Sequence, residues 1–109
     1  MVLVEGVNQV SSDEFESLIN NKKVHLLDVR EQSEYDSGRI KGSILVPATR
    51  FDEEFEKLKL KKSDIIALYC RSGNRSDFIA KKLVAAGYKK VFNLEMGIEE
   101  WQAWGKKLV

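Results

Sequence analysis

The chain has 109 residues and a formal net charge of +1, with 43% hydrophobic and 32% charged residues. This length suffices for one hydrophobic core but not for two, and the composition is unlike that of a disordered protein, so we expect one domain over residues 1–109. The near-neutral charge provides no clustered basic surface for a nucleic acid backbone or an anionic membrane, and neither is an expected partner.

Short β-branched runs alternate with longer segments of helical periodicity, which is typical of a parallel sheet covered by helices. Residues 1–10 contain no long apolar stretch, so we expect neither a signal peptide nor a membrane span, and a cytoplasmic protein. Ser11 and Glu14 have the spacing of a capping box at the start of a helix. In this half of the chain we expect strands over residues 7–10, 24–29 and 43–46, and helical segments over residues 11–20, 31–37 and 50–58.

The second half of the chain continues this alternation. Residues 65–69 (IIALY) are apolar enough for a strand that is buried on both faces. Residues 75–86 place most apolar side chains on one side, and Gly87 follows where a left-handed helix cap is expected. A strand over residues 91–94 and a helix over residues 97–104 complete the pattern. The predicted fold is α/β, with a parallel sheet of about five strands and helices on both faces.

Trp101 and Trp104 are three residues apart in the last predicted helix and therefore share one face. We expect both side chains to lie in the core.

The most informative segment is CRSGNRS, residues 70–76, which lies between the strand IIALY and the predicted helix. The carboxyl end of a central parallel strand is where α/β proteins bind ligands, and a tight loop leading into a helix points several backbone N–H groups at one spot. Such a loop binds an anion. Together with Arg71 and Arg75, it also favours the thiolate of Cys70, which we expect to be a nucleophile.

A single cysteine after an apolar strand is more often an inert buried side chain. The residues around Cys70 favour the reactive interpretation, because two arginines, two serines, an asparagine and a glycine follow within six positions. Gly73 permits a tight, left-handed backbone, and the serines supply hydroxyl donors. The expected substrate-binding residues are Arg71, Ser72, Gly73, Asn74, Arg75 and Ser76.

The chain contains one cysteine and one histidine, so it forms no internal disulfide and lacks the ligands of a Cys/His zinc site. His25, a lone strand histidine, is expected to be packed outside the site. Asp28 and Arg30 end the same strand, and we expect them to have supporting roles. Asp28 would orient an arginine or the backbone near the loop, and Arg30 would attract the substrate.

Three blocks of the sequence resemble the rhodanese family, specifically its single-domain sulfurtransferases. Residues 26–47 (LLDVREQSEYDSGRIKGSILVP) look like the family's strand-Asp-Val-Arg segment and the Gly-His-Ile-Pro-Gly-Ala stretch that follows it. Residues 69–76 (YCRSGNRS) are similar to the active-site loop, and residues 96–101 (MGIEEW) resemble Gly-Gly-x-x-x-Trp near the C-terminus.

The resemblance implies a three-layer rhodanese-like fold and an activity. Cys70 would take a sulfane sulfur from a small anionic donor, become a persulfide, and pass the sulfur to cyanide, to a thiol or to a protein acceptor. No metal or organic cofactor is implied. The arginine-rich loop resembles that of thiosulfate-type enzymes more than that of mercaptopyruvate-type enzymes.

Two other functions stay open. The first is a non-catalytic rhodanese module that binds a protein partner. The presence of Cys70 argues against it, because binding alone would not require the nucleophile. A cysteine phosphatase or arsenate reductase is the other alternative, but the phosphatase pattern is Cys-x5-Arg, whose wider loop encircles a phosphate. Here Arg75 makes Cys-x4-Arg, and Tyr69 stands where that pattern usually has His. The shorter loop favours sulfur transfer.

The sequence departs from the family pattern in two places. Arg39 and Lys41 replace the His and Pro of Gly-His-Ile-Pro-Gly, and this change is expected to alter the local loop and to make the pocket rim more positive. Met96 replaces the first glycine of the Gly-Gly pair, which is expected to change how closely that helix start approaches the active-site loop. Trp101 matches the family tryptophan that walls the pocket.

Overall fold

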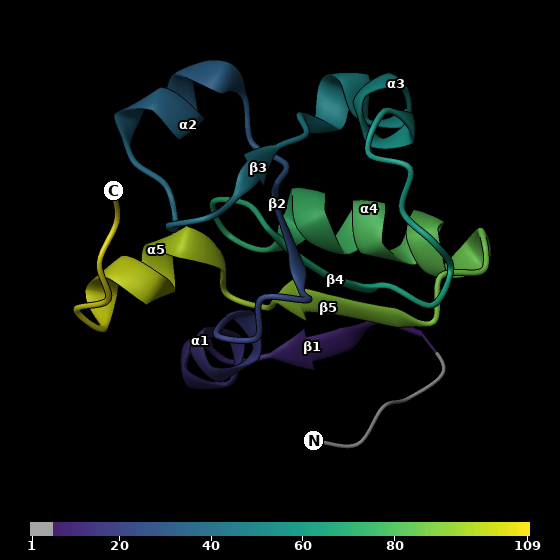
Figure 1. Ribbon diagram of the computed structural model, residues 1–109. Helices are drawn as coiled ribbons and strands as arrows, with labels where there is room; N and C mark the ends of the chain where they lie inside the picture. Colours follow the sequence, from purple (N-terminus) through teal and green to yellow (C-terminus); the bar gives the residue numbers. More distant parts are fainter. Residues whose placement is uncertain (1–5) are drawn as a thin grey trace.

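Five parallel strands form a single sheet in the order β1-β5-β4-β2-β3 (Figure 1). The computed structural model describes residues 6–109, so the first five residues of the segment expected to lack a signal peptide lie outside the described residues. The strands are β1 (Asn8–Val10), β2 (His25–Asp28), β3 (Ile44–Leu45), β4 (Ile65–Tyr69) and β5 (Lys90–Leu94). The helices are α1 (Ser12–Ile19), α2 (Gln32–Ser37), α3 (Phe51–Glu56), α4 (Asn74–Ala85) and α5 (Gly97–Ala103), with a 3-10 turn η1 (Ala48–Arg50) before α3.

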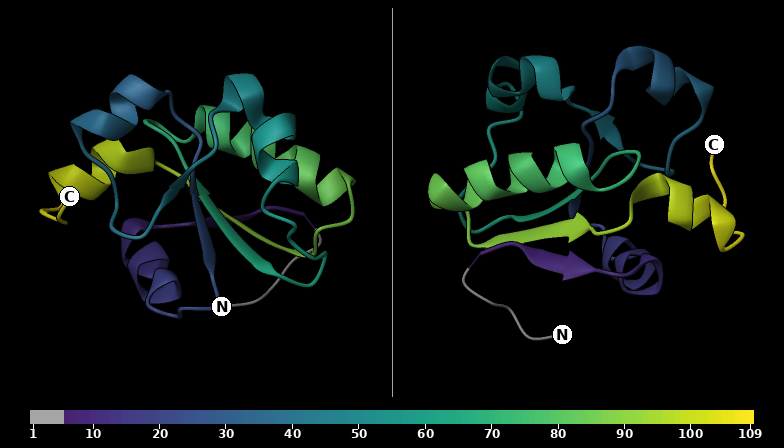
Figure 2. Two further views of the ribbon diagram at one scale, coloured as in Figure 1. Left: turned by 45° about the horizontal axis from the view of Figure 1, so that its top comes forward. Right: turned by 180° about the vertical axis from the view of Figure 1, so that it is seen from behind.

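Helices cover both faces of this sheet, which confirms the predicted three-layer α/β fold (Figure 2). On one face, apolar side chains of β2 and β4 pack against Phe51 and Phe55 of α3 and Ile79 and Leu83 of α4. On the other face, a second cluster packs the sheet against α1 and α5; its members include Val10, Phe15, Phe92, Ile98 and Trp101. The sheet is therefore buried on both sides, as apolar parallel strands require.

Strand β4 has the position at which α/β sheets bind ligands. The chain runs from β2 outward to β3 and then returns to β4 on the other side of β2, so the strand order reverses between β2 and β4. Ligands of open α/β sheets bind at the carboxyl ends of strands beside such a reversal. Cys70 directly follows Tyr69, the last residue of β4, and so lies at this edge.

The predicted helix ends are confirmed at two positions. The Ser11 side chain accepts from the Glu14 N–H, and the Glu14 carboxylate accepts from the Ser11 N–H, which completes the capping box of α1. At the end of α4, Gly87 has φ +101, and the N–H groups of Gly87 and Tyr88 donate to the carbonyls of Val84 and Leu83. These bonds form a Schellman cap, which needs a left-handed residue at Gly87.

Two predicted elements are shorter than the sequence suggested. The strand expected over residues 43–46 contributes only Ile44 and Leu45 to the ladder, because it lies at the sheet edge and pairs with β2 alone. The helix expected over residues 50–58 begins with the 3-10 turn η1 and ends at Glu56. Lys59, with φ +55, then turns the chain away from helical geometry.

The expectation that Trp104 lies in the core is wrong, since its side chain is 70% exposed. Helix α5 ends at Ala103, and Gly105, with φ +80, reverses the chain directly after Trp104. Lys106 then takes the place beside Trp101, with its Nζ 5.7 Å from the ring centroid and paired to Asp13 and Glu16. Trp101 is buried, as expected.

Within residues 6–109, no helix is both long enough and apolar enough to cross a bilayer.

Candidate active site

Cys70 occupies a loop of four residues between β4 and α4. Gly73 is the N-cap of α4 and has φ +95, a left-handed conformation that side chains other than glycine rarely adopt. A Cβ atom at Gly73 would lie 1.9 Å from the carbonyl oxygen of Glu95, so the close approach of β5 also requires glycine there. The chain therefore turns from strand to helix tightly enough to aim the first N–H groups of α4 back at Cys70.

Three hydrogen-bond donors surround the sulfur of Cys70. The Gly73 N–H donates to Sγ across 3.2 Å, the Ser76 N–H donates across 3.4 Å, and the Ser76 hydroxyl oxygen lies 3.3 Å from Sγ. Cys70 is 1% exposed and is a free thiol. Donors gathered around a desolvated sulfur stabilise negative charge on it, because hydrogen bonds to an ionised acceptor are stronger than neutral ones.

Helix α5 holds the opposite side of the loop. The Ile98 N–H donates to the Cys70 carbonyl across 2.9 Å, and the Glu99 N–H donates to the Arg71 carbonyl across 3.1 Å. A Cβ atom at Gly97 would lie 2.2 Å from the Arg71 carbonyl oxygen. The N–H groups at the start of α5 thus bind the carbonyl groups of the loop, while the N–H groups of Gly73 and Ser76 face Sγ. Met96 is exposed, and the close approach depends on Gly97.

Both arginines of the loop are paired with carboxylates that the sequence analysis missed. Arg75 donates twice to Glu34 of α2, at 2.8 and 2.9 Å, and Arg71 donates to Glu99 of α5 at 3.1 Å. Hydrogen bonding to Glu34 raises the pKa of Arg75 and, in return, holds the pKa of Glu34 at about 2. Arg71 keeps a side chain that is 68% exposed, so of the two it is the one more open to an incoming anion.

The remaining predicted loop residues differ in position. Gly73 and Ser76 are buried against the sulfur, whereas Ser72 and Asn74 are exposed. Of the two serines expected to donate, it is Ser76 that reaches Sγ.

Sequence comparison places these residues in a known family. A sequence model of the rhodanese-like domain matches residues 11–103, which include the whole Cys70 loop. The chain belongs to the rhodanese family. Its resemblance to this family, inferred from three short blocks, is thereby confirmed over most of the chain.

Several members of the rhodanese family are similar to the chain over most of its length. Thiosulfate sulfurtransferase GlpE of Coxiella burnetii is 30% identical over 95 residues, covering 87% of each chain. The putative sulfur carrier protein YrkF of Bacillus subtilis is 29% identical over 97 residues, and the alignment spans about half (51%) of YrkF's length. The crystal structure of a rhodanese-related protein from Thermoplasma volcanium superimposes with a TM-score of 0.80, at 29% identity and 94% and 97% coverage. These relatives support sulfurtransferase chemistry at the level of the family.

Asp28 and Arg30 lie next to the rhodanese loop but on the other face of the sheet. Asp28 pairs in register with Tyr69, whose side chain belongs to the core cluster opposite that of Cys70. Arg30 donates to both carboxylate oxygens of Asp28 and to the carbonyl of Gly38 at 2.7 Å. Asp28 therefore orients Arg30, and Arg30 is engaged with Gly38 instead of facing the sulfur. A substrate-attracting role for Arg30 stays a prediction.

Tyr69 joins Asp28 and Arg30 in tying residues 38–43 to the sheet. Its hydroxyl donates to Ser43 Oγ and accepts from the Ile40 N–H, both across 3.1 Å. Burial raises the pKa of this hydroxyl, and the negative charge of Asp28 adds to the effect.

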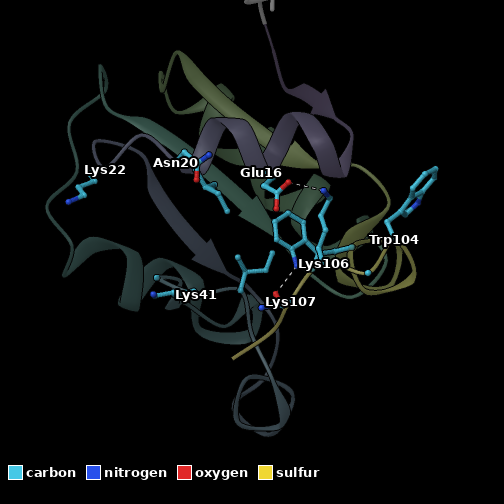
Figure 3. Close-up of a pocket in the computed structure, with 12 residues that line it drawn as sticks. Glu16, Asn20, Lys22, Lys41, Trp104, Lys106 and Lys107 are labelled. Atoms are coloured by element: carbon cyan, nitrogen blue, oxygen red, sulfur yellow. Dashed lines mark hydrogen bonds and ion pairs between the residues drawn. The ribbon is translucent and has the colours of Figure 1, made fainter.

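Two departures from the rhodanese pattern, Arg39 and Lys41, lie in the segment between α2 and β3. The Arg39 guanidinium stacks over the Tyr35 ring, 4.5 Å from its centroid. His25, which is not one of these departures, begins β2 at the end of that strand remote from Cys70. Lys41 borders a cavity of about 860 Å³ between α1, the turn at Gly42 and the C-terminal segment (Figure 3). Trp101 lines this cavity as well, with its indole N–H donating to the Lys107 carbonyl. None of residues 70–76 lines it, so it is separate from the loop.

Replacing Glu34 by glutamine is expected to lower stability at neutral pH but not in acid. The pKa of Glu34 is lowered in the folded protein from 4.5 to about 2, so the stabilisation by the Arg75 pair is complete above about pH 4.5. It is lost as the pH falls toward 2, where Glu34 becomes protonated. Urea titrations of wild type and Glu34→Gln across this range should show two curves that converge in acid. A difference that does not vary with pH would contradict the assignment.

Proposed function

We propose that this protein is a sulfurtransferase that carries sulfur as a persulfide on Cys70. The observation that carries the proposal is the set of three donors from Gly73 and Ser76 around a single buried sulfur. A persulfide sulfur needs donors and positive potential with no strong acid nearby to protonate it. The small loop suits one additional sulfur atom, and Arg71, whose side chain is 68% exposed, is the loop cation that an anionic donor would meet.

With thiosulfate as the donor, the reaction balances in two steps. The Cys70 thiolate attacks the outer sulfur of thiosulfate, a sulfur–sulfur bond forms to Cys70, and the bond to the inner sulfur breaks with both electrons leaving on sulfite. Cyanide or a thiolate then attacks the outer persulfide sulfur, and the Cys70 thiolate is released. With cyanide the product is thiocyanate, and no external oxidant or reductant is needed. The similarity to thiosulfate sulfurtransferase GlpE supports thiosulfate as the first donor to test.

The loop favours sulfur transfer over phosphate ester hydrolysis. In the phosphatase pattern the loop arginine would bind the phosphate, but here Arg75 makes a bidentate pair with Glu34. A phosphate in this loop would have to compete with that carboxylate.

The decisive experiment is the intact mass of the wild-type protein before and after incubation with thiosulfate, followed by a cyanide chase. We expect a gain of one sulfur atom, its removal by cyanide, and release of an equal amount of thiocyanate. Protein whose thiol has been blocked by iodoacetamide is the control and should gain no sulfur. If neither thiosulfate nor other sulfane donors give an adduct, the result would favour a module that binds a protein partner without catalysis. Sustained turnover of p-nitrophenyl phosphate would instead favour a phosphatase.

A further inference from the structure

A buried asparagine on β5 contacts the loop that surrounds Cys70 Sγ. Asn93 is 1% exposed and lies beside Gln9 in the register of β1 and β5. Its Nδ2 donates to Gln9 Oε1 across 2.8 Å and to the Gly73 carbonyl oxygen across 3.3 Å. The two N–H bonds of the amide therefore have separate acceptors, one on β1 and one in the sulfur-binding loop.

The direction of the Asn93 amide follows from Asp77, at the start of α4. Gln9 Nε2 donates to Asp77 Oδ1 across 2.6 Å, and because a carboxylate only accepts, Gln9 must present its Oε1 to Asn93. Asn93 must then turn its Nδ2 toward Gln9 and Gly73, since a flipped amide would face two acceptor oxygens. This constraint holds although Asn93 Oδ1 has no hydrogen-bond partner among residues 6–109.

The Ser76 hydroxyl lies between two acceptors. Its oxygen is 3.3 Å from Cys70 Sγ and 3.2 Å from the Gly73 carbonyl oxygen, and its single hydrogen can serve only one of them. The Gly73 oxygen has two lone pairs and already accepts from the Asp77 N–H, across 3.0 Å, and from Asn93 Nδ2. With both lone pairs occupied, the sulfur is the better acceptor for the Ser76 hydrogen.

We propose that Asn93 is a positioning residue that occupies the Gly73 carbonyl and thereby directs the Ser76 hydroxyl to Cys70 Sγ. The inference rests on the proposed function, in which a negative sulfur on Cys70 is the reacting group that this hydroxyl stabilises. Asn93 acts through Gly73 and Ser76, since its amide donates to Gln9 and Gly73 and not to the sulfur. Its place in the otherwise largely apolar strand KVFNL then has a reason, because an apolar residue there would leave one Gly73 lone pair to Ser76.

The test is the pH dependence of Cys70 alkylation by iodoacetamide in wild type, Asn93→Leu, Ser76→Ala and the double variant. Ser76→Ala removes the hydroxyl bond to the thiolate, and Asn93→Leu weakens that bond because the Gly73 carbonyl then competes for the Ser76 hydrogen. The pH of half-maximal alkylation should rise by about one unit in Ser76→Ala and by a smaller amount in Asn93→Leu. The double variant should show the same shift as Ser76→Ala alone, because without the Ser76 hydroxyl the state of the Gly73 carbonyl no longer affects the sulfur. No shift in Asn93→Leu, or shifts that add in the double variant, would overturn the proposal.

Gln9→Met is the matched control. It removes the side-chain tie between β1 and β5, and with it one of the two acceptors that orient the Asn93 amide, but the Gly73 carbonyl oxygen alone still requires Nδ2 to face it. The pH of half-maximal alkylation should therefore stay close to that of wild type. A shift as large as that of Asn93→Leu would mean that Asn93 matters only as part of a structural tie. Thermal unfolding monitors the fold, and Asn93→Ala, which also removes the donor, replaces Asn93→Leu if leucine does not fit.

Alkylation requires no sulfur donor, so this result is separate from that of the persulfide experiment. If the persulfide forms but Asn93→Leu alkylates like wild type, only the role of Asn93 is overturned. If no persulfide forms in wild type, the proposed function fails while the alkylation profiles still decide whether Asn93 controls the Ser76 hydroxyl.

Discussion

Replacing Cys70 by serine is expected to abolish sulfur transfer, with a loss of at least about 10³-fold. A serine hydroxyl stays protonated at neutral pH, and its oxygen cannot form the sulfur–sulfur bond on which the carrier depends. The donors from Gly73 and Ser76 would still bond the serine oxygen, so the loop should keep its shape. Thiocyanate release from thiosulfate and cyanide measures the loss, and intact mass should show no added sulfur.

The fold of Cys70→Ser should remain close to that of wild type, with the midpoint of thermal unfolding changed by less than about 5 °C. This comparison separates loss of the nucleophile from loss of structure. Sulfur transfer near the wild-type level in Cys70→Ser would refute the persulfide assignment, since Cys70 is the only cysteine in the chain.

Gly73→Ala is expected to damage both stability and activity. An alanine Cβ would meet the Glu95 carbonyl oxygen at 1.9 Å, and at φ +95 alanine is also strained. The left-handed backbone and the overpacking together cost about 2–5 kcal/mol, enough to lower the unfolding midpoint by at least about 10 °C. Relief of the clash must move the Gly73 N–H away from Sγ, so sulfur transfer should fall steeply even well below the unfolding midpoint.

Gly42→Ala is the matched control for Gly73→Ala. Gly42 has φ +87, similar to that of Gly73, but a Cβ there meets no atom within 4 Å. The control therefore carries the backbone strain alone, about 1–2 kcal/mol, and sulfur transfer should be unchanged. If Gly73→Ala behaves like Gly42→Ala in both stability and activity, the close approach of β5 does not shape the loop.

The sequence by itself determined the features that depend on neighbours within a few residues. The spacing of Ser11 and Glu14 predicted the start of α1, the apolar run before Cys70 predicted a buried strand, and Gly73 marked the tight turn into α4. These features are local, because capping bonds, side-chain periodicity and left-handed turns are set within one or two turns of the chain. The alternation of such elements was enough to predict the α/β fold.

Only the tertiary structure decided which distant residues complete the candidate site. Arg75 donates hydrogen bonds to Glu34, which is 41 positions away in the sequence, and Asn93 donates to the carbonyl of Gly73, which is 20 positions away. Such pairs depend on strand register and on how helices lie on the sheet, and neither leaves a local pattern. Asn93 did leave one signal, a polar residue in an otherwise largely apolar strand, but its partner could not be read from it. Trp104 shows the same limit, because its helical spacing from Trp101 did not reveal that the chain, turned at Gly105, would bring Lys106 beside the Trp101 ring and leave Trp104 exposed.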